Sequence, residues 1–279
     1  MAFESRLTRR ALLRGLLTTG TGATAGRLWH GFEYERHAVQ LVRGELPVVG
    51  LPRALDGLTV GLITDTHASA SVPDDDIRAA VSLLADAQPD VVALGGDYVT
   101  DMDTTRAVPS ADLLAPLASA PSGAFAVLGN HDDDRIVPAA LAARGFDVLR
   151  DERTARVIRG ETVVFAGLRY WTRRLADVAR VLDGAGPTTI LLAHDPRRLR
   201  EAAQLDVQLV LSGHTHGGQV VLPGLGAVAA RRFPTVAGPG TEGNCTVFVS
   251  RGVGTVVAPV RLNCPPEVSV LTLRSASPL

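Results

Sequence analysis

Five of the seven histidines of this chain lie in four short motifs, and each motif directly follows an apolar run. The motifs are Asp65-Thr66-His67, Gly129-Asn130-His131-Asp132, Ala193-His194-Asp195 and Gly213-His214-Thr215-His216. A fifth motif, Gly95-Gly96-Asp97, adds a carboxylate. Carboxylate, imidazole and amide groups are ligands of divalent cations, and two adjacent cations would suit attack on a phosphate ester.

The spacing within two of the motifs would let one cation bind two side chains. On an extended segment, residues i and i+2 point the same way, so Asp65 and His67 would face one cation together. His214 and His216 repeat this spacing after the apolar run 209–212. The glycines that flank this second pair allow a tight turn of the backbone near the metals.

Three further side chains would complete the ligand set. Asp97 has two carboxylate oxygens with which to bridge two cations, and Asn130 offers a neutral amide oxygen. His194 follows an apolar strand, where metal ligation would give a buried imidazole a partner. Each motif alone is weak evidence, because Gly and Asn favour turns and a single histidine is commonly an ordinary core residue. The ordered set predicts a centre for two divalent cations.

The motifs need elements that bring them together. Strand-length apolar runs precede them at 58–64, 90–94, 124–128, 188–193 and 209–212. A helical pattern follows Pro73, with a predicted buried stripe of Ile77, Ala80, Val81 and Leu84. Helical patterns recur at 110–118, 137–144, 173–182 and 197–203, while the tail beyond residue 218 is rich in strands. This alternation predicts an α/β layered domain completed by a mixed sheet. Ligands bind outside the carboxyl ends of such strands, so motifs distant in sequence can meet there.

The start of the chain is typical of an export signal. Two adjacent arginines, Arg9 and Arg10, precede a weakly apolar segment that ends in the small-residue pattern Ala23-Thr24-Ala25. We therefore predict a twin-arginine signal over 1–25, a lead-in over 26–56 whose Trp29 and Phe32 pack onto the domain edge, and one domain over 57–279. The alternative is an uncleaved basic amphipathic helix on the cytoplasmic membrane surface.

Composition limits the remaining choices. Hydrophobic residues are 46% of the chain, which is ample for a large core, and the net charge of −1 recruits no nucleic acid. Cys245 and Cys264 form neither a disulfide framework nor a zinc-ribbon pattern, and whether they pair stays open. The Gly- and Pro-rich segment 223–244 is predicted to be a long surface loop.

The ordered set D-x-H, G-G-D, G-N-H-D, H and G-H-x-H resembles the calcineurin-like metallophosphoesterase superfamily over about residues 58–219. The resemblance implies a four-layer α/β/β/α sandwich with mixed sheets and the metals at the sheet edge. It places Asp65, His67 and His216 on one metal, Asn130, His194 and His214 on the other, and Asp97 between them. It assigns His131 to catalysis, and Asp132 would orient an imidazole.

The expected activity is hydrolysis of a phosphoester or pyrophosphate bond by a metal-bridging hydroxide, on a small-molecule or lipid substrate. The export signal and Gly217-Gly218-Gln219 resemble an exported, membrane-associated bacterial branch, which includes UDP-2,3-diacylglucosamine-type pyrophosphohydrolases. A non-catalytic, metal-stabilised binding protein is the distant alternative. Mn²⁺, Zn²⁺ and Fe²⁺ all suit the ligands. In the purple acid phosphatase branch of the superfamily, a tyrosine three residues after the aspartate that corresponds to Asp97 binds ferric iron. That position is Thr100 here, so a purple ferric site is disfavoured.

Overall fold

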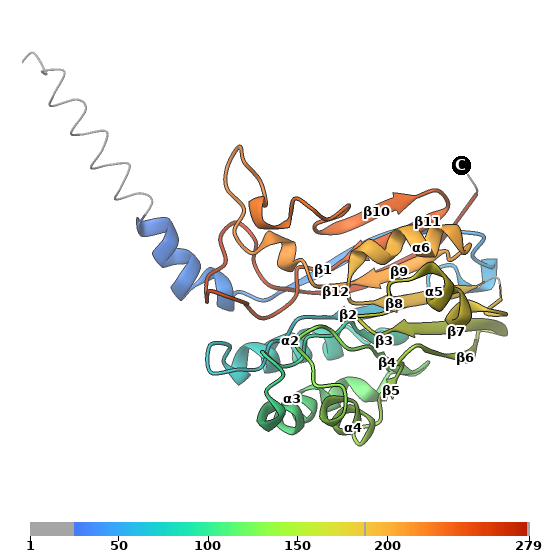
Figure 1. The fold of residues 1–279 in the computed structure, drawn as a ribbon, viewed down its shortest axis with the longest axis horizontal. Coiled ribbons are helices and arrows are strands. Elements are labelled where there is room, and N and C mark those ends of the chain that lie inside the picture. The colour runs from blue at the N-terminus through green and yellow to red at the C-terminus, as the bar shows by residue number, and fades with distance from the viewer. Residues whose placement is uncertain (1–24, 187, 278–279) are drawn as a thin grey trace, which may run out of the picture.

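Two six-stranded sheets lie face to face with helices outside each, in a computed structural model that describes residues 25–186 and 188–277 (Figure 1). This arrangement confirms the four-layer α/β/β/α sandwich. The twin-arginine segment falls outside the described residues, apart from Ala25. Among the described residues, no helix is both long and apolar enough to cross a membrane.

The first sheet is mixed and has the order β1-β12-β2-β3-β4-β5. Strands β2 to β5 are parallel to one another, whereas β12 is antiparallel to β2 and parallel to β1. Its strands are β1 (Gln40–Val49), β2 (Thr59–Ile63), β3 (Val91–Leu94), β4 (Ala124–Ala126), β5 (Asp147–Val148) and β12 (Glu267–Ala276). Helices α2 (Asp74–Asp86), α3 (Ala107–Leu114) and α4 (Ile136–Ala142) cover its outer face.

The second sheet is also mixed and has the order β10-β11-β9-β8-β7-β6. Strands β7, β8, β9 and β11 are parallel, and antiparallel β6 and β10 form the two edges. Its strands are β6 (Glu152–Ile158), β7 (Glu161–Leu168), β8 (Thr189–Ala193), β9 (Leu209–Ser212), β10 (Gly238–Glu242) and β11 (Cys245–Val249). Helices α5 (Leu175–Leu182) and α6 (Leu199–Gln204) pack on its outer face.

The central core lies between the two sheets, because each strand alternates its side chains between the two faces. Phe125 of β4 and Phe165 of β7 stack across this interface, with ring centroids 4.0 Å apart and planes 13° apart. Each outer face forms a separate core with its helices. In α2, the predicted apolar stripe of Ile77, Ala80, Val81 and Leu84 is buried against the first sheet.

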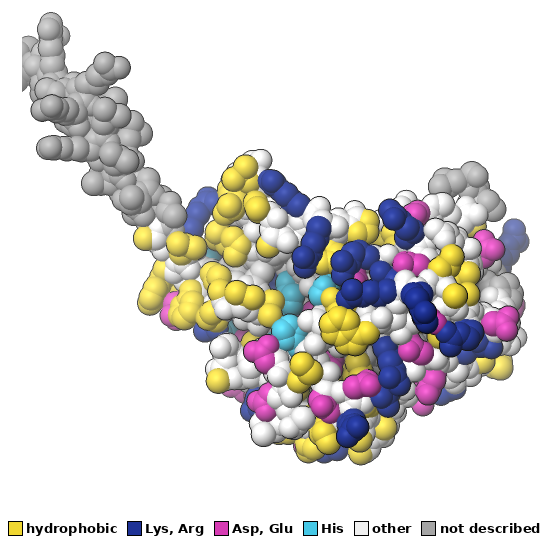
Figure 2. Space-filling model, viewed as in Figure 1, with side chains coloured by type: hydrophobic (Ala, Val, Ile, Leu, Met, Phe, Trp, Pro, Cys, Tyr) yellow, Lys and Arg dark blue, Asp and Glu magenta, His cyan; other side chains and the backbone are white. Residues whose placement is uncertain are grey.

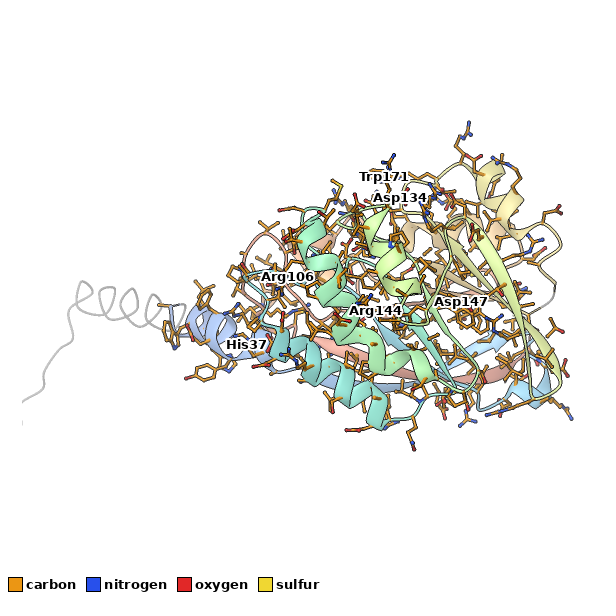
Figure 3. The ribbon with its side chains drawn as sticks, turned by 90° about the horizontal axis from the view of Figure 1, so that it is seen from below. His37, Arg106, Asp134, Arg144, Asp147 and Trp171 are labelled. Carbon is orange, nitrogen blue, oxygen red and sulfur yellow. The ribbon has the colours of Figure 1, made fainter. Side chains whose placement is uncertain are left out.

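Polar side-chain pairs link the segments outside the first sheet, and Figure 3 labels His37 and Arg144 among them. His37 lies 2.7 Å from the carboxylate of Asp76 at the start of α2. Arg144, just beyond α4, lies 2.8 Å from Asp112 of α3. These pairs are partly exposed, so each contributes at most about 1 kcal/mol, and packing of the apolar faces dominates the stability of this layer.

Several predictions about the flanking segments were wrong. The lead-in supplies β1, whose ten residues pair with β12, because the edge of the sheet offers its backbone groups partners. Trp29 and Phe32, expected to pack onto the domain, have exposed fractions of 61% and 40%. The segment predicted as one long loop contains β10, which pairs with β11. The pairing of Cys245 and Cys264, which the sequence left open, is a separate matter: in the structure both cysteines are buried and free.

The stacked phenylalanines offer a test of the inter-sheet core. We expect Phe125→Ala to lower the free energy of unfolding by about 3–5 kcal/mol, because it leaves a cavity between two rigid sheets. Val157→Ala, at a position of β6 whose side chain is 75% exposed, should change it by less than about 0.5 kcal/mol. Denaturant unfolding followed by circular dichroism would measure both, and equal effects would contradict the packing described.

Candidate metal centre

Five parallel strands from both sheets deliver the predicted ligands to one edge of the sandwich. In the first sheet, the loop after β2 carries Asp65 and His67, the loop after β3 carries Asp97, and the loop after β4 carries Asn130 and His131. In the second sheet, the loop after β8 carries His194 and the loop after β9 carries His214 and His216. Because parallel strands end at the same edge, residues about 150 positions apart come together there. The expectation that every motif follows the carboxyl end of a strand is confirmed.

The first ligand cluster consists of Asp65, His67 and His216, whose ligand atoms lie within 4.8 Å of one another. The Nε2 atoms of the two imidazoles are 3.2 Å apart, and Nε2 of His216 lies 3.4 Å from Oδ1 of Asp65. All three side chains are buried. Three donor atoms that converge on one point are suited to hold a cation.

The second cluster consists of Asp97, His194 and His214, again with ligand atoms within 4.8 Å of one another. Oδ2 of Asp97 lies 3.1 Å from Nε2 of His194 and 3.6 Å from Nε2 of His67, which belongs to the first cluster. The other oxygen, Oδ1, accepts a hydrogen bond of 2.8 Å from the amide of His131. Asp97 therefore stands between the two clusters, as a bridging ligand would.

The donor atoms fit a pair of divalent cations. Within the described residues, Oδ1 of Asn130, Nε2 of His194 and Nδ1 of His216 are buried and make no hydrogen bond of acceptable geometry. Such orphaned atoms are rare in folded proteins unless an ion or water completes them. Nδ1 of His194 lies 2.7 Å from the carbonyl oxygen of Gly95, and donating there directs the lone pair of Nε2 toward the cluster.

The backbone at the site differs from the extended geometry that the spacing suggested. Asp65, His67, Asp97, His214 and His216 all have positive φ, between 45° and 71°. Non-glycine residues rarely adopt this left-handed region, and those that do concentrate at functional sites. The ligand pairs therefore face one point because each loop turns sharply at its ligands, and the prediction of an extended segment was wrong.

Glycines let these loops approach one another. A Cβ atom on Gly129 would lie 2.0 Å from Oδ1 of Asp97, and one on Gly213 would lie 2.2 Å from Oδ2 of Asp65. Neither carboxylate can move away without leaving its hydrogen bonds to the amides of His131 and His214. The glycines of these motifs are thus required by the close packing around the carboxylates.

Burial sets the ionisation of most of the ligands. It raises the pKa of Asp65 to about 6, lowers the pKa of His67 to about 4 and lowers the pKa of His214 to about 3. Burial opposes ionisation of Asp97 as well, but the imidazole of His194 holds the pKa of that carboxyl well below its usual range. The same pair raises the pKa of His194 to about 10. A cation would take the place of the proton that His194 then carries.

Asp132 has partners other than the imidazole that we expected. Its buried carboxylate accepts hydrogen bonds of 2.8 Å from the amides of Asp97, Tyr98 and Gly129. The side chain therefore ties the loop after β3 to the loop after β4. Burial, reinforced by the carboxylate of Asp97, raises the pKa of Asp132 to about 7. Asp132 acts as a positioning residue for the backbone that carries Asp97.

His131 lies at the mouth of the site. Its ring is 5.0 Å from that of His67 in an edge-to-face arrangement, and the amide of Asp101 lies 3.2 Å from its Nδ1. Nδ1 also lies 3.3 Å from Oδ1 of Asp101, so both contacts with Asp101 are made by this nitrogen and leave Nε2 free of them. The imidazole is part of the wall of a cavity of about 610 Å³ that also reaches Asp97 and Asn130.

Three side chains at the site were missed by the sequence analysis. Tyr170 and Phe233 lie beside the ring of His214, at centroid distances of 5.2 and 5.4 Å. The hydroxyl of Thr100, considered only as a replaced tyrosine, lies 3.3 Å from Nδ1 of His67. None of them belongs to a motif with metal-ligand chemistry, so no sequence signal identified them.

Comparison with known proteins agrees with this geometry. A family model described as calcineurin-like phosphoesterase matches residues 58–218. The chain is 33% identical to the phosphodiesterase YaeI of Escherichia coli, over 76% of this chain and 80% of that protein. It is 26% identical to the uncharacterized metallophosphoesterase YkuE of Bacillus subtilis, over 98% of this chain and 99% of that protein.

A solved structure shows the same fold. The NAD nucleotidase of Haemophilus influenzae superimposes with a TM-score of 0.50 at 15% sequence identity, over 70% of this chain and 50% of that one. At this identity the likeness concerns the fold alone. Together with the two ligand clusters, the family match supports a binuclear divalent metal centre.

The position of Asp97 predicts a shared effect on both cations. We expect Asp97→Asn to weaken metal binding by at least about 10–100-fold, because the amide removes the charge between the clusters. Asp112→Asn, on the exposed side of α3, is the matched control and should retain full metal content. Elemental analysis after dialysis against limiting Mn²⁺ would measure both, and a variant that lost only one equivalent would argue against a bridge.

The contacts of Asp132 predict a structural effect of its removal. Asp132→Ala would remove an acceptor from four amides, those of Asp97, Tyr98, Gly129 and, at 3.3 Å, Val99. It should lower the free energy of unfolding by about 3 kcal/mol or more. Asp134→Ala, two residues later, breaks only partly exposed ion pairs and should cost at most about 1 kcal/mol. Thermal and denaturant unfolding would compare them, and similar stabilities would refute the role assigned to Asp132.

Proposed function

This chain belongs to the calcineurin-like phosphoesterase family and is a hydrolase acting on phosphoesters, and from that premise we propose that it cleaves a phosphodiester or pyrophosphate bond with water at a centre of two divalent cations. The observation that carries the proposal is the carboxylate of Asp97, within 3.6 Å of an imidazole from each cluster. One group placed in this way can serve two cations at once.

The residues would divide between the two cations as follows. Asp65, His67 and His216 would hold one, Asn130, His194 and His214 would hold the other, and Asp97 would serve both. When bound, two such cations lower the pKa of a water molecule and neutralise the charge of phosphoryl oxygens. Mn²⁺, Zn²⁺ and Fe²⁺ all accept this mixture of oxygen and nitrogen donors.

His131 would act on the leaving group. Hydrolysis forms one P–O bond to the oxygen of water and breaks the P–O bond to the departing oxygen, which needs a proton. Both contacts with Asp101 are made by Nδ1 of His131, so Nε2 is the nitrogen that could face the departing oxygen and give it a proton. The imidazole lies in the cavity wall beside Asp97, where it can reach a phosphate bound at the clusters.

Two narrower proposals remain beside this one. The apolar walls of the cavity favour a pyrophosphohydrolase of the UDP-2,3-diacylglucosamine type, which acts on a lipid-linked substrate. The adjacent Arg9 and Arg10 support export by the twin-arginine route to the cell envelope. A metal-stabilised binding protein would not need His131, whose position at the cavity favours the enzyme.

Removal of His131 tests the proposed chemistry. With Mn²⁺ and bis(p-nitrophenyl) phosphate, we expect His131→Ala to lower kcat by about 10²–10⁴-fold while the metal content stays near normal. A chelator should abolish the activity of the unmodified protein. His37→Ala, outside the site, is the matched control and should be fully active. A metal-loaded protein that hydrolyses no ester or anhydride in a broad panel would overturn the proposed function.

A further inference from the structure

The cavity at the metal centre changes character along its length. At one end it is lined by Asp97, Asn130 and His131, and beyond them its wall is largely aliphatic. The aliphatic part consists of Val220, Leu222, Val228, Val256, Val257 and Val260. With about 610 Å³ of space, the cavity has room for a phosphate group and a substantial apolar substituent.

Two loops build this aliphatic part, and Gln219 fastens them together. Its Nε2 donates to the carbonyl oxygens of Val256 and Ala258, at 3.1 and 2.8 Å, and its Oε1 accepts from the amide of Val256 at 2.9 Å. Gln219 comes three residues after His216. The aliphatic wall is therefore fixed relative to the first ligand cluster.

The rim of the cavity exposes apolar side chains to solvent. Leu225 is 58% exposed, and the side chain of Val257 is fully exposed at a φ of +67°. A β-branched residue rarely adopts this backbone conformation. Leu225 and Val257 therefore present aliphatic surface to solvent instead of packing it in the core.

The helix over residues 25–33 continues this apolar surface. It is joined to the second loop, because the amide of Arg261 donates to the carbonyl oxygen of Gly31 at 3.1 Å. Its exposed residues Leu28, Trp29 and Phe32 thus lie at the same end of the molecule as the cavity rim. Figure 2 shows hydrophobic side chains gathered at this end, next to visible histidines. We call the surface formed by Leu28, Trp29, Phe32, Leu225 and Val257 the apolar rim.

Positive charge accompanies the apolar rim. Within the described residues, Arg231 and Arg232 lie in no ion pair, and Arg231 donates to the carbonyl oxygen of Leu225 on the rim. Residues 1–24, which contain four arginines and one glutamate, join the described chain at this helix. An apolar surface flanked by Arg231 and Arg232, which make no ion pair within the described residues, is complementary to an anionic lipid layer.

We propose that the apolar rim docks on an anionic phospholipid bilayer, and that the aliphatic cavity takes the hydrocarbon chain of a lipid whose phosphoester reaches the metal centre. The inference rests on the proposed function and names its substrate class. The bilayer would shield the exposed side chains from water, and the same orientation would point the mouth of the cavity at the lipid.

Vesicle binding tests the docking surface without any catalysis. The metal-loaded full chain is sedimented with vesicles of phosphatidylglycerol and phosphatidylcholine in high salt, which screens the contribution of the basic segment. We expect Leu225→Asp and Trp29→Asp each to weaken binding by about tenfold. Val157→Asp, at a position of β6 whose side chain is 75% exposed, should bind as the unmodified protein does. Equal binding of all four proteins would overturn the docking surface, as would a dimer that dissociates on Leu225→Asp.

A pair of chromogenic diesters tests the cavity. Hexadecyl and ethyl p-nitrophenyl phosphate carry the same reacting group and differ only in the chain. We expect kcat/KM to favour the hexadecyl ester in vesicles by about 100-fold, and Val228→Asp to reduce that preference by about tenfold. If both esters are cleaved equally, the lipid inference fails and the proposed function stands. If neither is cleaved by the metal-loaded protein, the proposed function fails, and the vesicle assay still decides the docking surface.

Discussion

The structure of the site depends on the need to neutralise a buried cluster of acids and bases. Two carboxylates and four imidazoles lie within a few ångströms of one another in the interior, and Asp97 stands between imidazoles of both clusters. Protons satisfy only part of this set, because burial drives His67 and His214 toward the neutral state. Divalent cations satisfy all of it, and the remaining features of the site follow from holding them.

Holding the ligands requires backbone conformations that a chain avoids elsewhere. Five ligand residues have positive φ, and each costs of order 1 kcal/mol or more. The rigid parallel strands of two packed sheets compensate, because they fix where each loop starts. Asp132 adds a local constraint by accepting hydrogen bonds from four amides of the loops after β3 and β4. The strain is confined to loops, while the sheets beneath them keep ordinary geometry.

The metal centre and the aliphatic cavity share one chain segment, and this links reaction to substrate. His214 and His216 lie in the turn that leads to Gln219, whose side chain holds the cavity wall at Val256 and Ala258. A substrate held by an apolar substituent would thus be placed by the same loop that supplies ligands. Binding of the non-reacting part of a substrate lowers the reaction barrier efficiently, because it fixes the reacting groups in position in advance.

The sequence by itself determined the ligand set and an α/β layered domain, and its resemblance to a known family implied the order of the layers. Every predicted ligand follows an apolar strand, and periodicity alone gave α2 with its buried stripe. Only the tertiary structure decided the left-handed turns at Asp65 and His67, the amide partners of Asp132, and the place of β1 beside β12. The reason is physical. Residue type and spacing report local preference, whereas these features exist because distant strands meet and impose partners that no local pattern encodes.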